Sequence, residues 1–184
     1  MWEIFTSYLP SALLVTAALG SAQAATQMEE LARTLHPSDF PAQVEKLLQG
    51  GHPAQALELA DLGLRKSAQS AQLRFMRAVS LESLGRVSEA EAELRSLIAA
   101  YPEIPEPYNN LAVLEAQQAR LEEALKLLEQ ALLINPEFAL ARKNLGDVYL
   151  ALAMEAYEKA AAKLPRNTVL QQRLRTLQRI TSNE

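Results

Sequence analysis

Residue types recur every 34 residues along most of the sequence. One column of this repeat holds only alanine, at Ala56, Ala90 and Ala124. A second column holds small or medium-sized side chains: Val44, Ala78, Ala112 and Gly146. A sustained period of this length is typical of stacked helix pairs, because a single pair cannot bury its apolar face and must pack against its neighbours.

The third repeat shows the two expected helices most clearly. Each half places its apolar residues at steps of three and four, which is the spacing of one face of an amphipathic helix. The first face comprises Tyr108, Leu111, Ala112 and Glu115, and the second Leu121, Ala124, Leu125, Leu128, Ala131 and Leu132. Ala119 lies in the turn between them, in the same column as Gly51 and Gly85. Pro136 closes the repeat, because proline cannot continue the preceding helix.

The stretch from Pro105 to Pro136 resembles the tetratricopeptide repeat (TPR) family almost throughout. Residues 71–104 are also similar to the family pattern, although Arg74 and Arg77 stand where bulkier apolar residues are usual, and residues 37–70 are less similar. The resemblance implies an all-α fold, a right-handed α-solenoid of antiparallel helix pairs that forms a TPR-like superhelix. The expected array covers residues 37–165, with repeats at 37–70, 71–104, 105–138 and 139–165.

The fourth repeat is shorter than the others, because Pro165 follows Pro136 by only 29 residues. No glycine or proline occurs from Asp147 to Leu164. We therefore expect one continuous helix over about residues 139–163, roughly 37 Å long at 1.5 Å per residue.

An apolar stripe on this long helix would continue past the last packed pair. A capping helix and tail in residues 166–184 is one way to cover it. The alternative is a partner helix or a second copy of the chain, which leaves a homodimer open. The residues concerned are Leu145, Tyr149, Leu152, Ala156, Tyr157 and Ala160.

Residues 1–24 have the layout of a secretory signal peptide. An apolar run from Leu9 to Gly20 precedes Ala22-Gln23-Ala24, which fits a small-x-small cleavage site. The segment before the run has no Lys or Arg and carries Glu3, so an uncleaved N-terminal anchor is the alternative. A short helix is expected within residues 25–36, starting at a capping box of Thr26 and Glu29. We expect an exported, periplasmic protein, or one anchored in the inner membrane and facing the periplasm.

Residues that carry chemistry are scarce. The chain has no cysteine, and its two histidines, His36 and His52, lie beside prolines with no further metal-ligand types at fixed spacing. The sequence therefore predicts no metal, no cofactor and no enzymatic activity. The formal net charge is -4, with both signs interspersed, so we expect no nucleic-acid partner. A membrane is expected as a partner only if the N-terminal segment is retained as an anchor.

The TPR resemblance also implies a binding groove, because in this family the first helices of the pairs line a concave surface that holds peptides. Asn110 and Asn144 occupy one column, 34 residues apart. Some family members use asparagines at this column to bind the backbone of an extended peptide, since an amide both donates and accepts. Hydrogen bonding between neighbouring helices is the alternative role. The expected groove residues are Gln72, Phe75, Met76, Val79, Glu82, Asn109, Asn110, Val113, Gln117, Lys143, Asn144 and Asp147.

These observations favour a non-catalytic scaffold or adaptor that binds another protein or peptide in the bacterial cell envelope. Of the expected groove residues only Lys143 is basic, so capture of a peptide's terminal carboxylate is not expected. Two alternatives remain at this point. One is a membrane-anchored structural subunit that docks through the long fourth-repeat helix, and the other is an accessory periplasmic chaperone.

Overall fold

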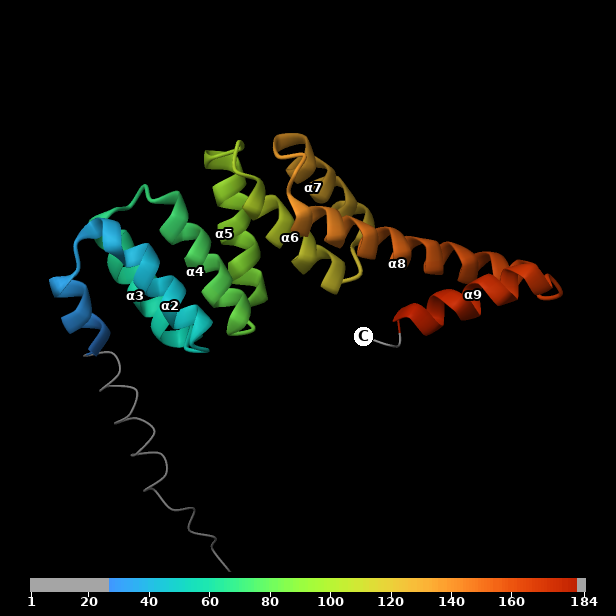
Figure 1. The fold of residues 1–184 in the computed structure, drawn as a ribbon, viewed down its shortest axis with the longest axis horizontal. Helices are drawn as coiled ribbons and strands as arrows, with labels where there is room; N and C mark the ends of the chain where they lie inside the picture. The colour runs from blue at the N-terminus through green and yellow to red at the C-terminus, as the bar shows by residue number, and fades with distance from the viewer. Residues whose placement is uncertain (1–26, 182–184) are drawn as a thin grey trace, which may run out of the picture. The chain divides into compact units, whose positions relative to one another are not determined.

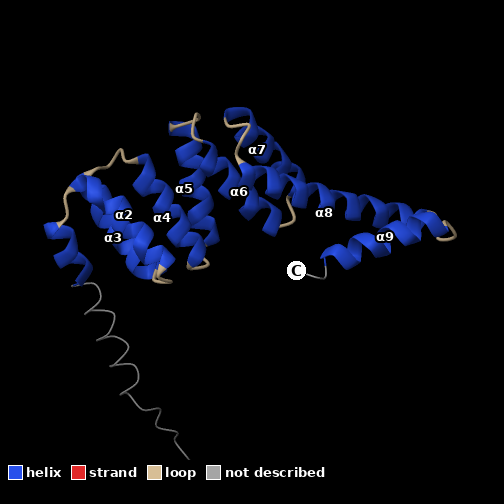
Figure 2. Ribbon diagram, in the orientation of Figure 1, coloured by secondary structure: helices blue, strands red, loops and turns tan. Residues whose placement is uncertain are grey.

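The computed structural model describes residues 27–181, and in this range the chain is helical without any strand (Figures 1 and 2). The expected signal segment and Thr26 lie outside the described residues. A helical segment runs through residues 27–34. The elements that follow are η1 (Pro37–Asp39), α2 (Phe40–Gln49), α3 (Pro53–Lys66), α4 (Ala71–Ser83), α5 (Val87–Ala100), α6 (Pro105–Gln117), α7 (Leu121–Ile134), α8 (Ala139–Lys163) and α9 (Thr168–Thr181). Within residues 27–181 no helix combines the length and the apolar character that a membrane span requires.

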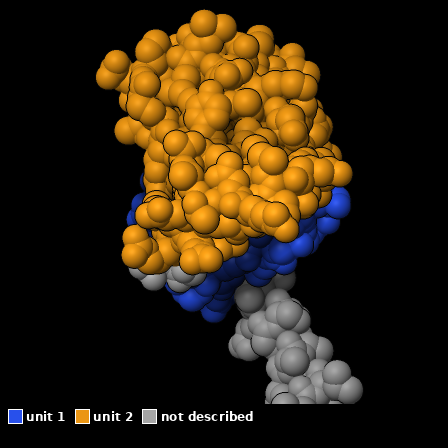
Figure 3. All heavy atoms as spheres, turned by 90° about the vertical axis from the view of Figure 1, so that its right-hand side faces the viewer, with its two compact units in different colours: residues 1–90 blue, residues 91–184 orange. Residues whose placement is uncertain are grey.

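The chain divides into two compact units, which have different colours in Figure 3. Unit 1 is residues 1–90 and unit 2 is residues 91–184, so the boundary falls within α5. The sequence predicts one repeat array across this boundary. Each unit has a buried core.

Unit 1 is built around a fully buried phenylalanine. Phe40 begins α2 and has no exposed surface, and it packs with Val44, Leu59 and Leu73 from α2, α3 and α4. Gly63 of α3 makes this possible, because a Cβ atom at that position would lie 2.6 Å from Cδ1 of Phe40. The absence of a side chain at residue 63 therefore lets the aromatic ring lie directly against the α3 backbone.

Lys66 joins the first helical segment to this core. Its ammonium group donates hydrogen bonds to the carbonyl oxygens of Ala32, at 2.5 Å, and Leu35, at 3.4 Å. It also lies 5.2 Å from the centroid of the Phe40 ring. Carbonyl groups at a helix C-terminus lack partners in the helix and carry partial negative charge, so a lysine is well suited to this position.

The turns within the helix pairs share a left-handed residue. Gly51, Gly85 and Ala119 have φ angles of 74°, 71° and 59°. In each turn the following amide donates to a carbonyl five residues earlier, as from Arg120 N to Glu115 O at 2.9 Å, which is a Schellman motif. The column seen in the sequence is therefore a column of helix C-terminal caps. Ala119 is the one residue of the three that has a Cβ atom, so the left-handed conformation is strained there.

Replacing Ala119 with glycine is expected to stabilise the protein by about 1 kcal/mol, because a left-handed residue with a Cβ is strained by roughly that amount. Urea unfolding monitored by circular dichroism measures the change. Ala92→Gly is the matched control, because Ala92 is exposed inside the regular helix α5. The free energy of unfolding of this control should fall by about 1 kcal/mol, because glycine has a lower helix propensity than alanine. A loss of stability in both variants would contradict the assignment of strain to Ala119.

Unit 2 packs α6, α7 and α8 around a second core. Ala112, Ala124, Leu128, Ala131 and Ala141 are all fully or almost fully buried in it. The small side chains allow the helices to approach one another closely, which is the role that the alanine columns predict. Figure 1 shows that α8 continues beyond α6 and α7 and that α9 folds back along it.

The apolar stripe on α8 is divided between two environments. Leu145 and Leu152 pack against the unit 2 core, while Tyr149 is 49% exposed. Helix α9 packs on the edge that holds Tyr157, whose hydroxyl accepts a hydrogen bond from Arg173 at 3.4 Å. The capping helix therefore covers one edge of α8 and leaves Tyr149 open to solvent.

Candidate peptide-binding site

Three asparagines form a connected row on α6 and α8 of unit 2. Nδ2 of Asn144 donates to Oδ1 of Asn109 at 2.9 Å, and Nδ2 of Asn109 donates to Oδ1 of Asn110 at 3.2 Å. Asn109 is only 2% exposed, whereas Asn110 and Asn144 are half-buried. We call Asn144, Asn109 and Asn110 the amide chain.

The amide chain joins the two asparagines that the repeat places in one column, but it does so through Asn109. Part of the hydrogen-bonding capacity of Asn144 is thus used between α6 and α8, as the alternative interpretation of the sequence expects. Within the described residues, no hydrogen bond occupies Nδ2 of Asn110 or Oδ1 of Asn144. The row therefore ends in a donor on α6 and an acceptor on α8.

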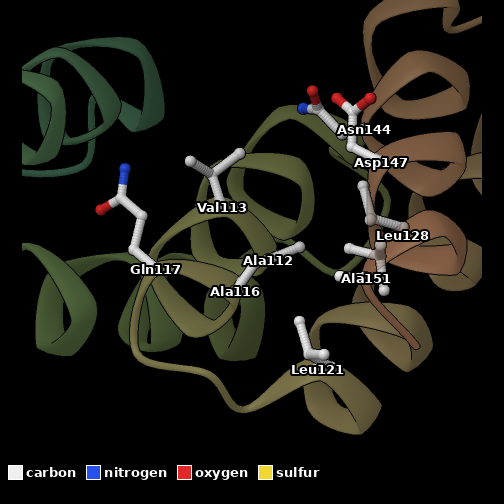
Figure 4. Close-up of a pocket in the computed structure, with 10 residues that line it drawn as sticks. Ala112, Val113, Ala116, Gln117, Leu121, Leu128, Asn144, Asp147 and Ala151 are labelled. Atoms are coloured by element: carbon white, nitrogen blue, oxygen red, sulfur yellow. The ribbon is translucent and has the colours of Figure 1, made fainter. Parts of the chain in front are cut away.

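A pocket of about 240 Å³ adjoins the amide chain. Figure 4 shows its mainly apolar floor, with the side chains of Asn144 and Asp147 next to each other at one edge and Gln117 at another. The lining residues are Ala112, Val113, Ala116, Gln117, Leu121, Leu128, Asn144, Asp147, Val148 and Ala151. We call this hollow the α6–α8 pocket.

Four expected groove residues line the α6–α8 pocket: Val113, Gln117, Asn144 and Asp147. Asn109, Asn110 and Lys143 do not line it. Lys143 instead pairs with Asp147 at 2.7 Å across one turn of α8, with both side chains more than half exposed. An exposed pair of this kind contributes little to stability, but it places opposite charges together at the rim.

The pocket floor lies outside the expected groove residues. The repeat pattern places Ala112 and Leu128 on the packing faces of their helices. Ala116 follows Val113 by three residues and Ala151 follows Asp147 by four, so helical spacing alone could have placed both beside expected groove residues. Leu121 and Val148 carry no comparable signal, since apolar residues at these positions fit an ordinary core.

A buried ionic cluster lies at the C-terminal end of α6. Glu115 of α6 has no exposed surface, and its two carboxylate oxygens accept hydrogen bonds from Arg95 of α5 and Arg120 of the α6–α7 turn. Arg120 also pairs with Glu91 at 2.9 Å. Hydrogen bonding to Glu115 raises the pKa of Arg120 above its usual range. These contacts fix the C-terminal end of α6, which carries Ala116 and Gln117.

The other five expected groove residues belong to α4 in unit 1. Gln72 is exposed, and Phe75, Met76, Val79 and Glu82 are half-buried. Met76 packs against the unit 1 core, and burial raises the pKa of Glu82. No group of three or more His, Asp or Glu side chains with the arrangement of a metal site occurs among residues 27–181.

Comparisons with known proteins agree with this architecture. Two family models described as tetratricopeptide repeat match residues 42–105 and 105–138. The first TPR domain of human RPAP3 superimposes with a TM-score of 0.60 at 21% identity, covering 64% of this chain and 92% of that one. The first TPR of Spaghetti (RPAP3), bound to the HSP90 peptide SRMEEVD, gives a TM-score of 0.58 at 21% identity, with coverage of 64% and 93%.

A third similar structure is YrrB, described as a TPR protein with an unusual peptide-binding site. Its TM-score is 0.56 at 21% identity, with coverage of 70% of this chain and 68% of that one. At these identities the structural likeness shows a shared fold. No curated protein sequence is significantly similar to the chain. Because the two family models together match more than half of its residues, the protein belongs to the tetratricopeptide repeat family.

Proposed function

We propose that this protein is a non-catalytic adaptor that binds an extended segment of a partner polypeptide on unit 2. The observation that carries the proposal is the open-ended amide chain beside the α6–α8 pocket. A peptide backbone presents one N–H and one C=O per residue. Asn144 offers an acceptor and Asn110 offers donors, so the two ends of the amide chain can satisfy both kinds of backbone group.

The α6–α8 pocket suits one side chain of such a segment. Its volume of about 240 Å³ is below the range of roughly 300–1,000 Å³ that is usual for small-molecule sites. In an extended peptide, successive side chains point to opposite faces. One apolar side chain can therefore enter the pocket while the backbone beside it pairs with the amide chain. Two of the similar TPR structures support this use of the fold. One is bound to a peptide, and the other is described as having an unusual peptide-binding site.

The charge of the part of unit 2 that carries the α6–α8 pocket selects against acidic segments. Residues 91–158 contain five Lys or Arg and twelve Asp or Glu, a formal net charge of -7. The HSP90 peptide bound to the Spaghetti TPR, SRMEEVD, contains three acidic residues and one arginine. Lys143, the one basic residue among the expected groove residues, is already paired with Asp147. The proposed ligand is therefore a neutral or basic segment with an apolar anchor.

Crosslinking in intact cells tests the adaptor function. The wild type is compared with Ala116→Phe, which fills the α6–α8 pocket, and with Ala92→Phe, which adds the same bulk at an exposed position of α5. We expect a partner polypeptide that is captured by the wild type and by Ala92→Phe, and lost in Ala116→Phe. Equal capture by all three proteins would count against the pocket as the binding site.

We place this adaptor in the bacterial envelope, on the basis of the signal-like residues 1–24. The intact mass of the protein purified from its native cells tests the placement. A mature chain that begins at Ala25 supports export with cleavage. A chain that retains residues 1–24 favours the anchored form instead.

A further inference from the structure

We propose that the turn between α8 and α9 docks on the surface of an anionic phospholipid bilayer. The surface concerned combines unpaired cations with exposed aliphatic side chains. We call it the cationic tip, and its residues are Lys163, Leu164, Pro165, Arg166, Val169 and Arg175. This interaction is separate from the peptide site on α6 and α8.

The charge distribution first singles out this region. Residues 159–181 contain six Lys or Arg and no Asp or Glu, giving a formal charge of +6. Residues 27–158 contain twelve Lys or Arg and twenty Asp or Glu, giving -8. Positive and negative residues are interspersed through residue 158 but not in residues 159–181, which corrects the expectation of interspersed charge along the whole chain. A local block of one sign is typical of a surface that meets an oppositely charged partner.

Three cations of the cationic tip have no acidic partner in the described part of the chain: Lys163, Arg166 and Arg175. Arg166 and Arg175 line one hollow of about 590 Å³, together with Pro165, Thr168, Gln171 and Gln172. Two guanidinium groups and a hydroxyl around one hollow are donors suited to phosphate oxygens. A phospholipid headgroup supplies such an anion at a membrane surface.

Aliphatic side chains lie among these cations. Leu164 is 53% exposed and Val169 is 60% exposed. The apolar face of α9 is not available for membrane insertion, because Leu170 is 8% exposed and α9 packs on α8. The tip can therefore place two aliphatic side chains at the headgroup level while α9 stays packed on α8. This is binding at the membrane surface without insertion of a helix.

The long α8 helix separates the cationic tip from the packed core of unit 2. Glu155 and Glu158 lie between the two, and Glu155 is paired with Lys159. Leu152 is the last α8 residue that packs on the unit 2 core. Lys163 lies eleven residues further along the helix, which corresponds to roughly 16 Å. Electrostatic interactions in physiological salt decay over about 8 Å, so an anionic surface at the tip feels little repulsion from that core. A nucleic acid is a poorer fit, because a long polyanion would extend over the acidic surface and the exposed aliphatic residues offer it no contact.

Vesicle co-sedimentation of the full chain tests the proposal. The vesicles contain phosphatidylcholine alone or with about one-third phosphatidylglycerol. Each tip cation is expected to contribute roughly fivefold to binding. The Lys163→Gln, Arg166→Gln, Arg175→Gln variant should therefore bind the anionic vesicles about 100-fold more weakly than the wild type. The charge-matched control is Arg33→Gln, Lys46→Gln, Lys126→Gln, which removes three cations from elsewhere and should change binding less than threefold.

A local probe distinguishes the cationic tip from residues 1–24. The chain has no cysteine, so Thr168→Cys carries an environment-sensitive dye at the tip alone, and Ala92→Cys carries it on α5. We expect a blue shift with anionic vesicles only for the dye at residue 168, which added salt reverses. Equal binding of the two triple variants would overturn the proposal. Binding to an oligonucleotide or to inorganic phosphate without any binding to the vesicles would also overturn it.

Discussion

Replacing Arg95 and Arg120 together with methionine is expected to lower the free energy of unfolding by about 3–5 kcal/mol, which is the usual result of leaving a buried charge without its partners. Glu115 has no exposed surface, and both of its oxygens are bound by these two arginines. The arginines themselves are partly exposed, so their loss alone removes little packing. The loss of stability comes from the carboxylate that stays behind.

A compensating substitution separates this explanation from a general loss of packing. Glu115→Leu in the same double variant removes the buried charge, and Leu81 stands at the equivalent position one repeat earlier, also buried. We expect this triple variant to recover most of the lost stability, because an apolar residue can replace a buried ionic group at little net cost. Urea unfolding measures all three proteins. A triple variant no more stable than the double variant would contradict the role assigned to Glu115.

Replacing Phe40 with alanine is expected to destabilise the protein by about 3–5 kcal/mol, the range for deleting a buried aromatic side chain and leaving a cavity. Phe40 has no exposed surface and contacts three helices of unit 1. The ring also lies near the ammonium group of Lys66, which caps the first helical segment. Thermal unfolding should show a lower midpoint. Hydrogen exchange should show reduced protection of the amides of residues 27–34.

The close contact between Phe40 and Gly63 supplies a control for this prediction. Gly63→Ala alone should destabilise the protein by about 1–3 kcal/mol, because the new methyl group meets the ring and the cost of overpacking exceeds the gain in helix propensity. In the Phe40→Ala background the same substitution should be stabilising, because the ring is gone and Cδ1 of Leu73, 2.9 Å from the new methyl group, can shift into the cavity. Additive effects of the two substitutions would contradict the packing described for unit 1.

Much of the fold could be predicted from spacing alone. The alanine columns predict where helices approach closely, and Ala56, Ala90 and Ala124 all have no exposed surface. The turn column predicts where each helix pair turns, and the structure adds that its residues, Ala119 included, are left-handed. The long α8 follows from the lack of any glycine or proline from Asp147 to Leu164. These features depend on local sequence and on the repeat period, which the chain shows directly.

The features that could not be predicted depend on pairs of residues far apart in the sequence. Glu115 occupies an apolar column, and nothing local indicates that Arg95 would reach it. Asn109 was expected to face a ligand, but it is buried between Asn110 and Asn144 and links them. The pocket floor was missed for a different reason, because alanines that pack between helices and alanines that line a hollow have the same pattern.

Binding of one peptide to four forms of the protein tests the adaptor function most directly. The peptide is selected from a random library against the wild type, and fluorescence anisotropy gives its Kd for the wild type, Asn144→Ala, Ala116→Phe and Ala92→Phe. We predict a neutral or basic peptide with an apolar anchor, a loss of tenfold or more in affinity for Asn144→Ala and Ala116→Phe, and a change below twofold for Ala92→Phe. Equal affinity of all four proteins for the selected peptide would contradict the assignment of the binding site to unit 2.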